Sequence, residues 1–240
     1  MKIGIKIFHE EKFARHFEYK ADFLEVMAIE GEDYSFLKNY NLPIVVHSQH
    51  EKFGVNFADK TIRDRNLRSI RFAIKLANTL DSEKIILHPG KIFDSNCSIE
   101  EAINTIKSLD FRILIENLPK KSKENKFNCT NPVETSEFLD KVNKGLCFDI
   151  NHAISTALTF KLDYLEIIKE FVKLKPRHYH IGGQLIKGDV GHLALDEGDI
   201  NLKEILKLLP KDAEITLETK PDISKTENDL RIIKEIIDSI

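Results

Sequence analysis

The sequence predicts an α/β fold, a single (β/α)8 barrel that occupies residues 1–240. Eight short apolar runs, rich in β-branched residues, recur along the chain, and helical patterns of apolar residues lie between most of them. Uninterrupted apolar runs of this length are typical of parallel strands that are covered on both faces. A chain of 240 residues is also close to the length of about 250 residues that is usual for such a barrel.

Eight strands are expected in chain order, at residues 2–8, 22–28, 43–47, 84–88, 112–116, 145–149, 177–181 and 214–218. The alternative is a doubly wound sheet, which would normally carry a glycine-rich phosphate loop after its first strand. No such loop follows residues 2–8. The Gly-Gly-Gln at 182–184 follows the seventh run and lacks the spacing of a dinucleotide-binding loop.

Six helices are predicted from apolar periodicity, at residues 59–80, 99–109, 132–142, 162–172, 202–209 and 230–237. The first is the clearest, because Ile62, Ile70 and Ala73 belong to one apolar stripe along it. The helix at 132–142 begins with Pro132 after Asn131, a favourable cap followed by proline at the first helical position.

Composition excludes several classes of protein. The 36 Lys and Arg residues against 39 Asp and Glu residues give a net charge of −3, which argues against a strongly basic nucleic-acid coat protein. No apolar stretch approaches the ~20 residues of a membrane span, and we expect no secretion signal. Three cysteines without a CxxC spacing argue against a disulfide framework and favour a cytoplasmic protein. No protein partner is evident.

Residues able to bind a metal ion occur at the carboxyl ends of six successive predicted strands: His47, His88, Glu116, Asp149, His180 and Glu218. In a parallel barrel these ends meet at one face, where active sites are built. His152 and His192 follow shortly after the sixth and seventh strands. Imidazole and carboxylate together suit Zn²⁺ or Mn²⁺, and so many ligands exceed what one ion needs. The pattern therefore predicts a multinuclear metal site.

Seven motifs appear in order after these strands: HSQHEKFGVNFAD, ILHPG, IEN, LCFDINHA, HIGG, GHLALDEGDI and TLET. This pattern resembles the endonuclease IV branch of the xylose-isomerase-like TIM barrels. The resemblance implies up to three zinc ions. It assigns His47 and His88 to the first ion, Glu116 as a bridge, Asp149, His180 and Glu218 to the second, and His152 and His192 to the third.

Some positions depart from that resemblance. The aspartate of the family's DxH pair would stand at Val190, so Asp189 is the candidate to replace it. His50 occupies the position where the family usually has tyrosine. Glu25, on the second strand, is more similar to the sugar isomerases and epimerases of the same superfamily. In those enzymes Glu116, Asp149, His180 and Glu218 would hold one Mn²⁺ or similar ion.

Two functions are compatible with these residues. The first is hydrolysis of DNA on the 5′ side of an abasic site, with Glu116 and Glu218 as catalytic residues. The alternative is isomerisation or epimerisation of a small sugar or sugar phosphate, in which the same two carboxylates move a proton. Hydrolysis is preferred, because the alternative leaves four histidines without a metal to bind: His47, His88, His152 and His192.

Further residues are predicted to face the substrate: His9, His50, Lys91 and Lys187. Lysines follow several strands and suit a phosphate-bearing substrate: Lys91, Lys120, Lys121, Lys123, Lys126, Lys187 and Lys220. His178 shares a strand face with His180 and is expected to be a buried, hydrogen-bonded residue one layer deeper. Cys147 is expected to pack in the core.

Overall fold

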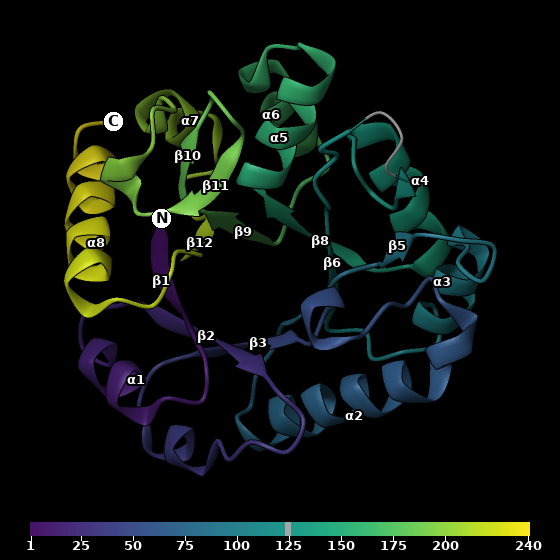
Figure 1. Ribbon diagram of the computed structural model, residues 1–240. Coiled ribbons are helices and arrows are strands. Elements are labelled where there is room, and N and C mark those ends of the chain that lie inside the picture. Colours follow the sequence, from purple (N-terminus) through teal and green to yellow (C-terminus); the bar gives the residue numbers. More distant parts are fainter. Residues whose placement is uncertain (123–125) are drawn as a thin grey trace.

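The computed structural model describes residues 1–122 and 126–240. Eight parallel strands close into a barrel in the order β1-β12-β9-β8-β6-β4-β3-β2 (Figure 1). They are β1 (Lys2–Ile7), β2 (Phe23–Ala28), β3 (Ile44–Ser48), β4 (Ile85–Leu87), β6 (Ile113–Glu116), β8 (Gly145–Asp149), β9 (His178–Ile181) and β12 (Glu214–Leu217). The predicted barrel is confirmed, and each strand lies within one residue of its predicted limits at both ends.

Helices surround the strands (Figure 1). They are α1 (Glu11–Phe17), α2 (Arg63–Thr79), α3 (Ile99–Ile106), α4 (Pro132–Val142), α5 (Ile150–Phe160), α6 (Tyr164–Lys173), α7 (Leu202–Leu208) and α8 (Ile223–Asp238). The described residues also form short 3-10 helices: η1 (Ser35–Asn39), η2 (Glu51–Phe53), η3 (Lys60–Ile62) and η4 (Leu195–Glu197). Within the described ranges, no helix is long and apolar enough to span a membrane.

The helices depart from the prediction at four places. The prediction omitted α1, because this short helix buries only Ala14 and Phe17 and shows no clear periodicity. It also omitted α5, which starts directly after β8 and is buried on most sides. The helix predicted at residues 59–80 is divided into η3 and α2, which begins at Arg63. Finally, α8 begins at Ile223 rather than at residue 230, because Asp222 caps a polar first turn by accepting a hydrogen bond from the Lys225 amide.

Two small antiparallel ribbons complete the described elements. One pairs β5 (Lys91–Ile92) with β7 (Lys126–Phe127), and the other pairs β10 (Gly183–Leu185) with β11 (Val190–Leu193). The β10–β11 ribbon follows β9, at the carboxyl end of the barrel. We refer to residues 183–193 as the rim hairpin.

The barrel interior has an apolar lower layer and a polar upper layer. Phe23, Val45, Ile86, Leu114 and Cys147 form a separate buried cluster inside the strands. The Phe23 ring crosses the barrel so closely that a Cβ on Gly4 would lie 2.1 Å from it, which explains the glycine there. Because side chains alternate along a strand, the residues two positions further on also point inward. All five are acidic or histidine: Glu25, His47, His88, Glu116 and Asp149.

Candidate metal centre

One group of side chains at the strand ends, called here the first cluster, contains His47 of β3, His88 after β4 and Glu116 of β6. His47 Nε2 lies 3.0 Å and His88 Nε2 lies 3.2 Å from the same oxygen, Glu116 Oε2. Burial alone would lower the pKa of His88, but Glu116 and Glu51 outweigh it and raise that pKa to about 10. The two carboxylates therefore create a negative electrostatic potential at His88, which favours a positive charge there. A bound cation would supply such a charge.

A second cluster lies beside the first and shares Glu116 with it; its other members are Asp149, His180 and Glu218. His180 Nδ1 lies 2.9 Å from Glu218 Oε2, 3.5 Å from Glu116 Oε2 and 3.9 Å from Asp149 Oδ2. Nevertheless Asp149 Oδ2, His180 Nδ1 and Glu218 Oε2 are buried without any hydrogen-bond partner. Unpartnered buried polar atoms are costly, and a divalent cation between them would satisfy all three. These residues therefore fit a metal ion.

The histidines of both clusters share a second property: an oxygen acceptor lies beside the ring nitrogen that faces away from the cluster. His47 Nδ1 lies 2.7 Å from the Ser48 carbonyl oxygen, and His88 Nδ1 lies 3.1 Å from Glu51 Oε2. His180 Nε2 lies 2.9 Å from Glu25 Oε2. Such acceptors fix the ring orientation and leave the other nitrogen for a metal, an arrangement that is usual for metal-binding histidines.

A third group, the rim cluster, contains His152 of α5 and His192 of the rim hairpin, whose rings lie 5.3 Å apart. Their ligand atoms come within reach of Asp149. His152 Nδ1 lies 2.8 Å from the Asn117 carbonyl oxygen, and His192 Nδ1 lies 3.2 Å from that of Glu218. In both rings Nδ1 thus lies beside a backbone carbonyl oxygen. Unlike the histidines of the first two clusters, His152 also directs this same nitrogen toward carboxylates, at 3.4 Å from Glu116 Oε1 and 3.7 Å from Asp149 Oδ2.

The carboxylate that the resemblance led us to expect is not part of the rim cluster. Asp189 Oδ1 accepts hydrogen bonds from Ser155 Oγ at 2.6 Å and from Gln184 Nε2 at 2.7 Å. Val190, at the position of the usual aspartate, is 46% exposed. Asp189 therefore fastens the rim hairpin to α5 through Ser155, and Asp149 is the carboxylate near His152 and His192.

The clusters open into a cavity of about 460 Å³ at the carboxyl ends of the strands. Its lining includes His50, Glu51, His88, Glu116, His152, His192 and Glu218. Five lysines from separate parts of the chain also line it: Lys6, Lys52, Lys91, Lys121 and Lys220. The cavity thus combines a carboxylate-rich floor with positive charge, which suits a substrate that carries a negatively charged group.

The residues predicted to face the substrate divide into two sets. His50 and Lys91 line the cavity, whereas His9 and Lys187 are exposed and are not among its lining residues. Among the other loop lysines, Lys120 lies over the Phe160 ring, away from the cavity lining. Lys123 and the Lys126 side chain lie outside what the structure describes.

The deeper residues lie where they were expected. His178 is fully buried, and its Nε2 lies 2.8 Å from Thr216 Oγ1 and 3.0 Å from Glu25 Oε2. Cys147 packs among apolar side chains inside the barrel. Its Sγ also lies 3.5 Å from His180 Nε2, a contact that the sequence did not indicate.

Several residues that support the site were not singled out from the sequence. Asn117 holds the end of β8, because its side chain accepts from the Asp149 amide at 2.7 Å and donates to the Asp149 carbonyl oxygen at 2.9 Å. Asn151 accepts from the Gly182 amide at 2.7 Å and donates to Gln184 Oε1 at 2.9 Å. Asn117, Asn151 and Gln184 stand inside or next to the motifs IEN, DINHA and HIGG. That position was the sequence signal by which they could have been found.

Comparison with known proteins gives a consistent picture of the fold. A model of the xylose isomerase-like TIM barrel family matches residues 32–236. An uncharacterized protein of Methanocaldococcus jannaschii is 27% identical over 256 residues, which cover 96% of this chain and 84% of the relative.

Two solved structures that bear different names resemble the chain. A D-tagatose 3-epimerase-like protein has a TM-score of 0.79 and 24% identity and covers 100% of this chain and 98% of its own. Endonuclease IV from Thermus thermophilus has a TM-score of 0.76 and 15% identity, with 100% of both chains covered. Such low identities support the fold alone, so the choice between the two chemistries depends on the site.

Proposed function

The chain belongs to the xylose isomerase-like TIM barrel family, and we propose that it is a phosphodiesterase with two divalent ions, zinc by preference, that cleaves DNA on the 5′ side of abasic sites. The observation that carries the proposal is the surplus of prepared ligands. His47 and His88 present nitrogens to Glu116 in addition to the complete second cluster. A single-ion enzyme would leave that additional group without a metal to bind.

Each cluster has its own part in this proposal. Glu116 joins the two clusters, since its carboxylate approaches His47, His88 and His180. Divalent ions held there supply activation of water and stabilisation of charge on the phosphate. Because Asp189 is hydrogen-bonded to Ser155 and Gln184 and position 190 is valine, the rim cluster is assigned to the substrate. In this proposal the Nε2 atoms of His152 and His192 would hydrogen-bond phosphate or sugar oxygens.

Lysines around the cavity support a phosphate-bearing substrate. Lys52, Lys91, Lys121 and Lys220 come from different loops, and their charge surrounds a floor that bound ions would bring closer to neutral. The formal charge of the whole chain is −3, so the positive charge is a local property of this cavity. Binding to a polyanion through such lysines weakens as salt concentration rises.

The test is incubation with a duplex that contains one abasic site, in the presence of Zn²⁺, Mn²⁺ or Co²⁺. Incision on the 5′ side of the lesion is expected, with no incision of an otherwise identical undamaged duplex. Metal analysis of protein purified without added metal should find two equivalents. Absence of incision with all three metals, over a range of salt concentrations, would rule the proposal out.

The second candidate is a single-ion sugar isomerase or epimerase. The observation that favours it is the second cluster by itself, in which Glu116 and Glu218 both approach His180 and could move a proton on a bound sugar. Conversion of ketohexoses or their phosphates with one equivalent of Mn²⁺, without incision of abasic DNA, would establish this candidate and displace the first.

A further inference from the structure

A buried ion pair lies directly beneath the second cluster and is not itself part of it. Lys6 Nζ of β1 donates to Glu25 Oε1 of β2 at 2.6 Å. The Lys6 side chain is 3% exposed and that of Glu25 is fully buried. Glu25 Oε2 in turn accepts a hydrogen bond from Thr216 Oγ1 at 2.7 Å and lies 3.0 Å from His178 Nε2. Both charges are thus neutralised and hydrogen-bonded inside the barrel, which a stable buried pair requires.

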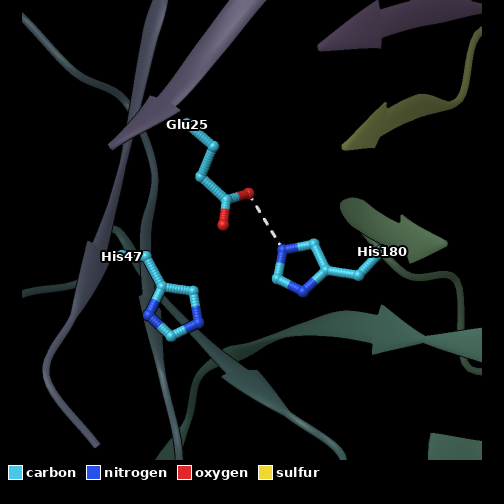
Figure 2. Close-up of side chains that lie close together, drawn as sticks. All are labelled: Glu25, His47 and His180. Atoms are coloured by element: carbon cyan, nitrogen blue, oxygen red, sulfur yellow. Dashed lines mark hydrogen bonds and ion pairs between the residues drawn. The ribbon is translucent and has the colours of Figure 1, made fainter. Parts of the chain in front are cut away.

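Each member of this pair also contacts one residue of the second cluster. Glu25 Oε2 lies 2.9 Å from His180 Nε2, the contact drawn as a dashed line in Figure 2. Lys6 Nζ lies 3.6 Å from Glu218 Oε1. In both cases the other polar atom of the residue, His180 Nδ1 or Glu218 Oε2, is the buried atom without a hydrogen-bond partner. These two atoms lie 2.9 Å apart.

Glu25, His47 and His180 also come close enough together to suggest a metal group of their own (Figure 2). An ion is not expected there, because the Lys6 ammonium already donates a hydrogen bond to Glu25 Oε1. The remaining oxygen of Glu25 is engaged by Thr216 and two histidines. The charge of Glu25 is therefore balanced from within the protein, and its place is outside the ligand set.

We propose that the Lys6–Glu25 pair is a positioning element that selects which atoms of His180 and Glu218 face the second ion. Glu25 contacts His180 Nε2, so that His180 Nδ1 points to the ion. Lys6 contacts Glu218 Oε1, so that Glu218 Oε2 points to the same ion. Lys6, Glu25 and His180 stand on β1, β2 and β9, and Glu218 directly follows β12. These four strands are consecutive around the barrel, so the pair is fixed by the closed sheet. This inference rests on the metal centre of the proposed function.

The test replaces both charges together, because removing one partner alone would leave a buried unpaired charge. In Lys6→Met/Glu25→Met the pair becomes apolar at similar volume, and His180 loses its acceptor. In Lys6→Met/Glu25→Gln the amide oxygen can still accept from His180. The matched control is Lys84→Met/Glu214→Gln, which removes a partly buried ion pair at the opposite end of the barrel, between the residue before β4 and the first residue of β12.

Binding of Co²⁺ is measured by titration and by its visible spectrum, with circular dichroism to verify folding. We expect the Met/Met variant to bind one of two equivalents about 10- to 100-fold more weakly, as for loss of other outer partners of metal ligands. Its spectrum should change, whereas the other equivalent and the control keep wild-type values. The Met/Gln variant should lose less affinity but still show an altered spectrum, because Glu218 is released from Lys6.

Wild-type affinity and spectrum in folded Met/Met protein would overturn the inference. If that variant does not fold, an unchanged affinity and spectrum in the Met/Gln variant would overturn it instead. The proposed function fails by a different result: two well-bound Co²⁺ ions in the wild type without incision of abasic DNA would reject phosphodiester cleavage and leave the positioning role intact. A wild type that binds no Co²⁺ would reject both.

Discussion

The first two clusters and the rim cluster differ in what holds their side chains. Residues of the first two clusters stand on barrel strands or directly after them, where neighbouring strands fix the backbone on both sides. His152 and His192 of the rim cluster stand on the first turn of α5 and on the rim hairpin. In the rim hairpin, Asp189 and His192 both have positive φ, 51° and 56°, which costs a non-glycine residue about 1–2 kcal/mol.

Side-chain hydrogen bonds offset that cost. Gln184 is fully buried, and its amide joins Asn151 on one side to Ser155 and Asp189 on the other. The carboxylate best placed by sequence to complete the rim cluster is thereby used to hold the rim hairpin. The comparison teaches that the closed sheet holds the first two clusters, whereas side-chain hydrogen bonds within the rim hairpin and to α5 hold the hairpin that carries His192.

The largest expected effect is that of Glu116→Gln, which removes the carboxylate shared by the first two clusters. Both ions should be bound at least about 100-fold more weakly, more than loss of an outer partner costs, and incision should fall below detection. Metal analysis and the incision assay measure this. Glu137→Gln, on the exposed side of α4, is the control and should behave as the wild type. Two retained equivalents in Glu116→Gln would show that the clusters do not share a ligand.

A smaller effect is expected from Glu51→Leu, which removes the acceptor beside His88 Nδ1. The ion of the first cluster should bind about 10- to 100-fold more weakly and that of the second should be unaffected. Glu51→Gln keeps an acceptor oxygen and should lose less. Titration with Co²⁺ separates the two ions, and equal weakening of both would contradict the division into two clusters.

Replacement of His192 by alanine tests the rim cluster directly. If His192 contacts substrate by one hydrogen bond, worth about 0.5–1.5 kcal/mol, incision should slow by up to about tenfold. The metal content should stay at two equivalents. Loss of a full equivalent in this variant would mean instead that the rim cluster holds an ion of its own, with Asp149 as its carboxylate.

The smallest effect concerns the lysines. Lys91→Gln should raise KM by less than about fivefold, since charge interactions near the surface contribute roughly 0.2–1 kcal/mol. Lys187→Gln should leave KM unchanged, because Lys187 is exposed and does not line the cavity. Both are measured by incision kinetics at low and moderate salt. A larger effect from Lys187 than from Lys91 would indicate that substrate extends over the rim hairpin.

Much of the candidate site could be predicted from the sequence, because strands obey a simple rule. A buried parallel strand is an apolar run, and its carboxyl end lies at the active face, so His47, His88, Glu116 and Asp149 could be assigned to one place from local sequence. The rim hairpin could not, since its course depends on Gln184 and Asn151, whose partners lie about 30 residues away along the chain.

By itself, the sequence determined the eight strands, their order and the residues that end them, since these follow from local apolar patterns and from the geometry of parallel strands. The tertiary structure decided which atoms of those residues meet. Glu25 and His180 are separated by 155 residues, and Lys6 and Glu218 by still more, yet closure of the barrel makes their strands neighbours or brings them across one interior. Hydrogen bonds and ion pairs between such distant residues depend on distance and direction, which no local pattern of residue types contains.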